Sequence, residues 1–204
     1  RGVVLSATYE ARAHGVRSGM SSTEARRLAP RATFLAPDFD SYTAVSKSIV
    51  AVFRSVSAVV ESASIDEAYL DLTGAVRMFG GAAQIGEYVR ALVSDEQQIT
   101  CSVGIGPTKF VAKVASRAAK PDGLIDVPPE GVVGFLHPLP VEAMWGVGNA
   151  TAQKLHRLGV FTVGDLAHTP RSALRPAFGP HASGMLSELA WGRDRRWVTP
   201  LEPE

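Results

Sequence analysis

Two acidic residues, Asp66 and Glu67, stand side by side in the stretch SIDEAYLDLTG, and they constrain the fold more than any other feature of the chain. The apolar residues around them, Ile65, Ala68 and Leu70, are typical of a β-strand at the edge of a core. An unpaired carboxylate in such surroundings is energetically costly. The sequence therefore predicts a compensating positive charge beside the pair.

The runs on either side of the acids, VVESASI and AYLDLT, both read as strands. In a straight strand neighbouring side chains point to opposite faces, so the two carboxylates could not share a ligand. We therefore expect Asp66 and Glu67 at the tip of a β-hairpin. Hard oxygen donors without His or Cys favour magnesium, so both are candidate metal ligands and catalytic residues. A pair of solvated turn acids is the alternative that the pattern leaves open, and Asp71 is expected to be a structural acid at a strand end.

A stripe of basic residues follows at helical spacing, with no acid among its members: Lys109, Lys113, Arg117 and Lys120. Solvated helix faces usually mix the two signs, because opposite charges at i,i+4 are mildly stabilising. The stripe therefore favours phosphate binding over the ordinary solvated face. The preceding GIGPTK lacks the spacing of a phosphate-binding P-loop and is interpreted as a strand-to-helix turn.

Near the start, SATYEAR places Ser6, Tyr9 and Arg12 at three-residue intervals on the expected face of a helix start. A hydroxyl, a phenol and a guanidinium that converge there would suit a nucleoside triphosphate. Surface packing of a Tyr and an Arg on a helix is the alternative.

The stretch MWGVGNATAQKLHRLGVFTVGDLA fits a helix-hairpin-helix. Gly146 and Gly148 would let the hairpin backbone approach a DNA phosphate, and the next helix would offer N–H groups to it. Lys154 adds positive charge nearby, so these three are candidate DNA-binding residues. A generic antiparallel helix pair is the alternative. A looser second half follows, with a turn at Gly179.

In the middle of the chain the predicted order is helix, strand, strand, helix, strand, which is an α+β pattern. It matches the split βαβ, ferredoxin-like arrangement with its first strand absent. From about Pro129 onward, short helices punctuated by Gly and Pro mark a second module.

The 204 residues are 46% hydrophobic and 20% charged, with a net charge of +1, as in ordinary globular proteins. No apolar run approaches the roughly 18 residues that a membrane span needs, so we expect no membrane association. Cys101 is the only cysteine, which excludes an internal disulfide and fits a reducing, cytoplasmic location. The histidines lack metal-ligand spacing. Because the sequence begins with Arg1 rather than Met, we expect it to be a piece of a longer protein.

Four ordered motifs together resemble the Y-family translesion DNA polymerases, most closely the DinB, or DNA polymerase IV, branch: SATYEARAHGVRSGM, SIDEAYLD, SVGIG with KFVAKVASRAAKPDG, and WGVGNATAQKL. The resemblance covers essentially the whole chain. It implies a right-hand architecture with a ferredoxin-like palm sheet, small α/β fingers and a helix-hairpin-helix thumb. The implied boundaries are fingers 1–38, palm 39–128, thumb 129–192 and a linker 193–204.

The resemblance also implies residue roles. Asp66 and Glu67 match the family's paired acids, which hold two Mg²⁺ ions at the primer end. Tyr9 and Arg12, with Ser6 at a position usually held by a hydroxyl residue, match contacts to the incoming dNTP, and Lys120 matches a further phosphate contact. The implied activity is low-fidelity, poorly processive DNA synthesis past damage on primer-template DNA, by a monomer that contacts a sliding clamp through a segment outside this chain.

Two family elements have no counterpart in this sequence: the first palm strand, with a further metal-binding aspartate, and the little-finger domain after the thumb. We therefore expect the 204-residue chain alone not to extend a primer. Two alternatives stay open. One is a noncatalytic relative for DNA binding or scaffolding. The other is a nucleotidyl cyclase, whose palm also carries an acidic hairpin, although the helix-hairpin-helix does not favour it.

Overall fold

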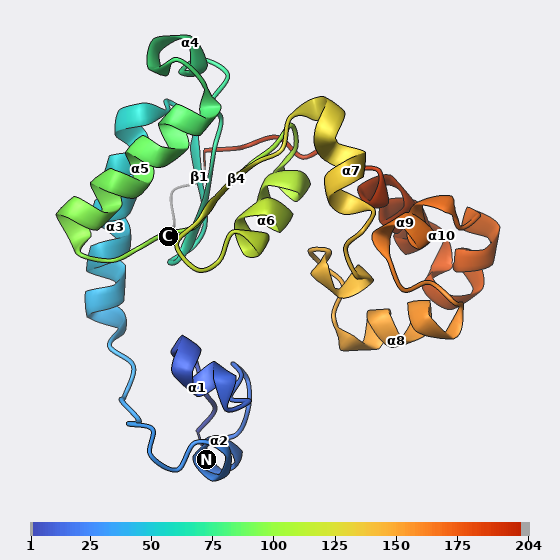
Figure 1. Cartoon of the computed structure of the whole chain (residues 1–204), viewed down its shortest axis with the longest axis horizontal. Coiled ribbons are helices and arrows are strands. Elements are labelled where there is room, and N and C mark those ends of the chain that lie inside the picture. The colour runs from blue at the N-terminus through green and yellow to red at the C-terminus, as the bar shows by residue number, and fades with distance from the viewer. Residues whose placement is uncertain (1, 201–204) are drawn as a thin grey trace. The chain divides into compact units, whose positions relative to one another are not determined.

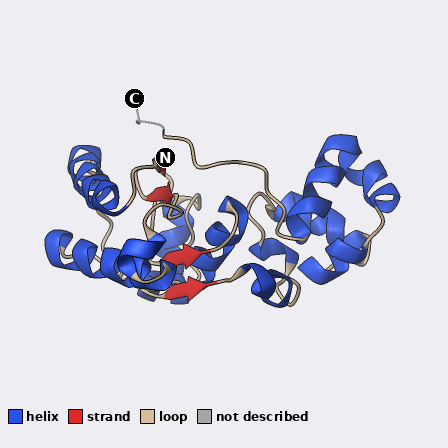
Figure 2. Ribbon diagram, turned by 90° about the horizontal axis from the view of Figure 1, so that it is seen from above, coloured by secondary structure: helices blue, strands red, loops and turns tan. Residues whose placement is uncertain are grey.

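The computed structural model describes residues 2–200, and they divide into two compact units, one up to Thr43 and the other from Ala44 onward. Helices dominate both, and the strands are few and short (Figures 1 and 2). Within the described residues, none of the helices is both long and apolar enough to cross a membrane.

The first unit is built around two short helices, α1 (Tyr9–Ala13) and α2 (Ser22–Leu28). The Ser21 hydroxyl caps α2, because it accepts a hydrogen bond from the Glu24 amide at 3.2 Å. The hydrophobic core of the first unit is small and centres on Val16, Ala25 and Ala29.

Helix α3 (Phe39–Val56) carries apolar residues at helical spacing, but the face that they form is not uniformly buried. Val52 and Val56 are buried, whereas Tyr42 near the start is 41% exposed. In the second unit, Val52 and Val56 pack with Ile85 of α5 (Ala82–Gln97). The short α4 (Val76–Phe79) lies between α3 and α5 in the sequence.

Strand β3 (Val103–Ile105) pairs in parallel with β4 (Leu124–Asp126), and α6 (Lys109–Ala118) connects them. Gly104 has to be a glycine here, because a Cβ would lie 2.1 Å from the carbonyl oxygen of Ala112 in α6. Val103 and Ile105 point the other way, towards Gly86 of α5. The strands therefore lie between α5 and α6, as Figure 1 shows.

The other two strands, β1 (Val60–Ser64) and β2 (Glu67–Leu70), form an antiparallel pair. The predicted order of helix, strand, strand, helix, strand is thus confirmed. In the part of the chain that the structure describes, the strands make two separate two-stranded ladders rather than one continuous sheet.

The remaining elements form a helical module: η1 (Pro129–Gly131), α7 (Val132–Leu136), η2 (Val141–Ala143), α8 (Asn149–Arg157), α9 (Val163–His168) and α10 (Arg171–Ala190). Its core includes Leu136, Leu155 and Leu174 and continues into Phe110 and Val114 of α6. Helix α6 therefore belongs to two structures at once, since its backbone packs on β3 and its apolar face packs against the helical module.

Candidate functional site

The acids Asp66 and Glu67 lie at the tip of the β1–β2 hairpin, as predicted. Ile65 and Asp66 form the turn, and Glu67 begins β2 opposite Ser64. The strand pairing shifts register between Ser62 and Ser64, which tightens the hairpin end. Both acids are exposed rather than partly buried, so the turn presents two neighbouring carboxylates to solvent.

Each carboxylate has a separate partner. The Ser64 hydroxyl donates to Oδ1 of Asp66 at 2.5 Å, and the Lys113 ammonium of α6 contacts the carboxylate of Glu67. Lys113 is thus the compensating charge that the sequence predicts, but it reaches only one acid of the pair.

The hairpin tip fits a metal in its donor chemistry, since hard cations prefer carboxylate oxygens. Among residues 2–200, however, no group of three or more His, Cys, Asp or Glu side chains is placed to hold a metal ion. Asp66 and Glu67 by themselves could therefore supply only part of a coordination sphere. Asp71 takes the structural role expected of it, because its carboxylate accepts the Thr73 amide at 2.9 Å.

The basic stripe on α6 is satisfied mainly by the protein itself, which corrects the expectation that the stripe as a whole faces phosphate. Lys109 pairs with Glu61 of β1 at 2.5 Å, and Lys113 contacts Glu67. The acids that balance the stripe come from other elements, so the sequence of the helix does not reveal them. Arg117 donates to the carbonyl oxygen of Glu142 at 3.2 Å.

Lys120 differs from the other members of the stripe. It lies beyond the last residue of α6, is exposed, and its side chain makes no hydrogen bond or ion pair with any residue that the structure describes. Lys109, Lys113 and Arg117 each have a polar partner in the described part of the chain. Lys120 has none there, so its ammonium is available to an external anion.

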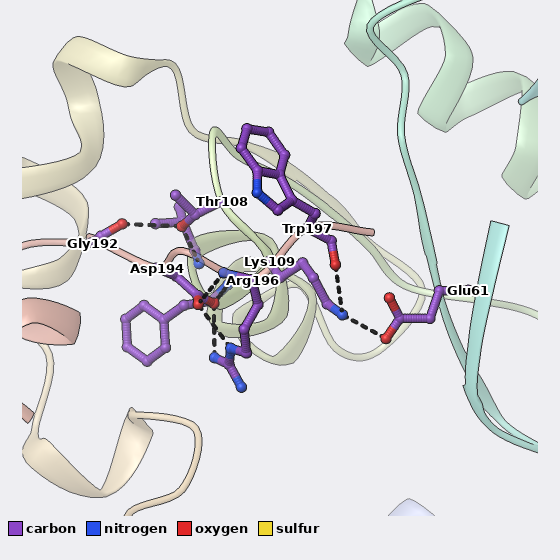
Figure 3. A network of polar contacts seen from close by, with 9 residues as sticks. Glu61, Thr108, Lys109, Gly192, Asp194, Arg196 and Trp197 are labelled. Carbon is purple, nitrogen blue, oxygen red and sulfur yellow. Dashed lines mark hydrogen bonds and ion pairs between the residues drawn. The ribbon is translucent and has the colours of Figure 1, made fainter. Parts of the chain in front are cut away.

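The segment after α10 is bound to α6 and β1 by a network of polar contacts (Figure 3). The Asp194 carboxylate, 4% exposed, accepts the Phe110 amide at the start of α6 at 3.2 Å and pairs with Arg196 at 2.7 Å. The backbone amide of Thr199 donates to Glu61 at 2.8 Å. No pattern in the sequence indicates this network, because only the three-dimensional fold brings its residues together.

In the first unit, Tyr9 and Arg12 lie on α1, with the guanidinium carbon 5.7 Å from the ring centroid. Arg12 Nε also donates to the carbonyl oxygen of Ala7 at 2.9 Å. Thr8, rather than Ser6, caps the helix. The expectation that Ser6 shares a helix face with the other two is therefore wrong, because Ser6 precedes the helix, where it is exposed.

The helix-hairpin-helix turn forms where the glycines predict it, between η2 and α8. Gly146 has φ +90°, a conformation that favours glycine, and Gly148 is the N-cap of α8 without a side-chain cap. Ala152 and Leu155 of α8 are buried. The amide groups at the start of α8 are therefore not capped by a side chain.

Lys154 is exposed on α8, and its ammonium points towards α10. Nζ donates to the carbonyl oxygen of Ala177 at 3.4 Å and lies 5.8 Å from the centre of the Phe178 ring. The looser second half is also as predicted, since Gly179 breaks α10 with φ +77°.

Comparison with protein families matches both parts of the chain. The impB/mucB/samB family matches residues 1–117, and the IMS family HHH motif matches residues 129–160. The chain is 45% identical over 195 residues to DNA polymerase IV 2 of Mesorhizobium japonicum, covering 96% of this chain and 47% of the relative. It is 46% identical over 200 residues to DNA polymerase IV of Alkalilimnicola ehrlichii, covering 98% and 56%.

Solved structures give the same result. DinB from Sulfolobus solfataricus superposes with a TM-score of 0.90 at 31% identity, over 97% of this chain and 58% of that one. An insertion ternary complex of Dbh DNA polymerase gives a TM-score of 0.88, also at 31% identity and with the same coverage. The chain spans about half the length of the curated relatives that it matches. The fold, the hairpin acids and these matches together show that the chain belongs to the impB/mucB/samB family and has the fold of the Y-family, DinB-type DNA polymerases.

Proposed function

We propose that this chain carries the catalytic acids and the DNA-gripping module of a DNA polymerase that copies past damaged or stalled sites. One observation carries the proposal: Asp66 and Glu67 lie together, exposed, at a hairpin tip in a chain 45% identical to a protein named DNA polymerase IV 2. The proposed parts are fingers 1–38, palm 39–128, thumb 129–192 and linker 193–204.

In this proposal Asp66 and Glu67 hold two Mg²⁺ ions, with further ligands from the dNTP phosphates and from outside the described residues. These carboxylates would thereby place Lewis-acid chemistry beside the primer 3′-hydroxyl, whose pKa it would lower, and beside the leaving pyrophosphate, whose charge it would offset. The hydroxyl of Ser64 orients the Asp66 carboxylate. The ammonium of Lys113 contacts the Glu67 carboxylate and would have to give way when a cation binds there.

The proposed triphosphate contacts are Ser6, Tyr9, Arg12 and Lys120. Arg12 and Lys120 supply positive charge, and the Tyr9 hydroxyl and Ser6 supply hydrogen bonds. The exposure of all four in the structure supports this role. A small fingers unit, with a core of few buried residues, would close loosely over the base pair and so tolerate damaged templates.

Primer-template DNA is the proposed partner of the helix-hairpin-helix. A backbone phosphate would meet the uncapped amides at the start of α8, close to Gly146 and Gly148. Lys154 would add nearby charge. A Cβ atom added to either glycine would meet nothing within 4 Å, so there is room for the DNA backbone to approach closely.

A primer-extension assay on the full-length natural protein that carries this chain tests the proposal. Template-directed, Mg²⁺-dependent addition of dNTPs that is lost in Asp66→Ala is the expected result. DNA binding without extension by the wild-type protein would instead identify a noncatalytic relative. Conversion of a nucleoside triphosphate into a cyclic product without template would identify a cyclase.

A further inference from the structure

Arg90 of α5 ties together three elements that are separate in the sequence. Its Nη2 donates to the backbone carbonyl of Asp122 at 2.6 Å and to the Asp122 carboxylate at 2.9 Å. Its Nε donates to the carbonyl oxygen of Cys101 at 3.4 Å, and Nη1 pairs with Glu87 at 2.6 Å. The side chain is 20% exposed. One planar guanidinium thus connects α5, the segment before β3 and the turn after α6.

That turn, residues 120–123, has a backbone that needs support. Asp122 has φ +42°, an uncommon conformation for a residue with a side chain. A Cβ on Gly123 would lie 2.3 Å from the carbonyl oxygen of Ala119, so the chain folds back tightly on the end of α6. The two hydrogen bonds from Arg90 to Asp122 hold the turn in this conformation, and a forked donor suits the task.

Lys120 lies in the same turn and depends on it. Helix α6 ends at Ala118, and the Lys120 amide reaches the Arg117 carbonyl only at 3.4 Å. The Lys120 side chain is exposed and makes no hydrogen bond or ion pair with the described part of the chain that would fix its direction. The backbone of the turn therefore sets where the side chain starts, and so the region that its ammonium can reach.

The geometry points to Arg90 as a positioning residue, which holds the 120–123 turn so that Lys120 meets the triphosphate of the incoming nucleotide. The inference rests on the proposed function, in which Lys120 is a phosphate contact. Arg90 acts through the turn rather than by its own charge, because Glu87 and Asp122 both pair with the guanidinium and balance it.

The test is a double-mutant cycle in single-turnover dNTP incorporation by the full-length natural protein. We expect Lys120→Ala to raise the apparent dNTP Kd about 10-fold and Arg90→Ala about 5-fold, with the maximal rate changing less than about 2-fold. In the Lys120→Ala background, Arg90→Ala should have no further effect on that Kd, because the group it positions is gone. Arg90→Lys, which keeps the charge but loses the fork, should give an intermediate Kd.

Arg77→Ala is the matched control. It removes an exposed guanidinium from α4 that makes no ion pair with the described residues, and it should leave the dNTP Kd unchanged. Effects of Arg90→Ala and Lys120→Ala that multiply would overturn the inference and show a general structural role. Normal incorporation with an unchanged Kd in Lys120→Ala would overturn it too, while the polymerase assignment would stand. A wild-type protein that incorporates no dNTP would instead contradict the proposed function.

Discussion

The ammonium of Lys109 lies 2.5 Å from Oε1 of Glu61, and the two side chains are only 10% and 12% exposed. The pair joins α6 to β1. Lys109 also binds the segment after α10, because its ammonium donates to the carbonyl oxygen of Trp197 at 3.5 Å. Strand β1 leads to the turn with Asp66 and Glu67. The base of the acidic hairpin is therefore fixed by an enclosed ion pair at one end while its tip stays exposed.

Removing one partner of this pair should destabilise the fold strongly. Glu61→Ala leaves the Lys109 ammonium enclosed without a counter-charge, and we expect a loss of about 3 kcal/mol in the free energy of unfolding by urea. The surface pair between Arg171 and Glu188 provides the control. Because Arg171 is 59% exposed, Arg171→Ala should cost less than about 1 kcal/mol. Equal losses in the two variants would contradict a special role for the enclosed pair.

The same network predicts loss of stability in acid. Burial acts to raise the pKa of Glu61, but hydrogen bonds from Lys109 and the Thr199 amide outweigh it and lower that pKa below its ordinary 4.5. Burial is likewise outweighed at Asp194 by hydrogen bonds from Arg196, which lower its pKa below 3.8. A carboxyl whose pKa is lowered on folding stabilises the fold above its unfolded pKa and loses that effect as the pH falls through its folded pKa.

We therefore expect the contribution of these two acids to be constant near neutral pH and to disappear progressively below about pH 4.5. Urea unfolding measured between pH 7 and pH 3 checks this, with Glu61→Gln as the comparison. The variant should start less stable and lose less stability over that range than the wild type. Parallel curves for the two proteins would show that Glu61 does not contribute to the acid response.

The two hairpin glycines make separable predictions for DNA binding. Gly148 has φ −88° and open space around its Cβ position, so Gly148→Ala should keep the fold and lower the melting temperature only slightly, because alanine is a poorer N-cap than glycine. If a DNA phosphate approaches there, the added methyl group should still raise the Kd for primer-template about 10-fold. Gly146→Ala is the contrasting variant, since φ +90° makes it cost about 1 kcal/mol of stability. Unchanged DNA affinity in Gly148→Ala would place the DNA elsewhere.

Lys113 should compete with bound metal. Its ammonium contacts Glu67, so a cation that arrives at that carboxylate meets a positive charge. Lys113→Met should therefore lower the Mg²⁺ concentration needed for half-maximal primer extension by about 3-fold at low salt. The shift should shrink as the salt concentration rises. A higher Mg²⁺ requirement would mean that Lys113 assists metal binding by orienting Glu67.

Local sequence signals predicted local structure well. The hairpin tip at Asp66 follows from two strand-like runs with little between them, and the turn before α8 follows from Gly146 and Gly148. Gly179, which breaks α10 with φ +77°, is where the sequence predicts a turn. Each of these features depends on residues that are close in the chain.

Long-range pairing was not predictable in the same way. The stripe on α6 looked free to bind phosphate because the acids that balance it, Glu61 and Glu67, belong to a hairpin far away in the sequence. Arg90 and Asp122 meet only because α5 and the turn after α6 pack around the same strands. The expectation that Ser6 shares a helix face with Tyr9 and Arg12 was wrong for a local reason. Thr8 is the N-cap, so α1 begins after Ser6.

Single-turnover nucleotide incorporation by the full-length natural protein most directly tests whether Asp66 and Glu67 hold the catalytic metals. Its Mg²⁺ dependence is measured for the wild type, Asp66→Asn and Glu67→Gln. Both variants keep the size of the side chain and remove a charged metal ligand. We expect each to lower the rate by about 100-fold or more while primer-template affinity stays unchanged. Wild-type rates and wild-type Mg²⁺ dependence in both variants would contradict the claim that these hairpin acids hold the catalytic metals.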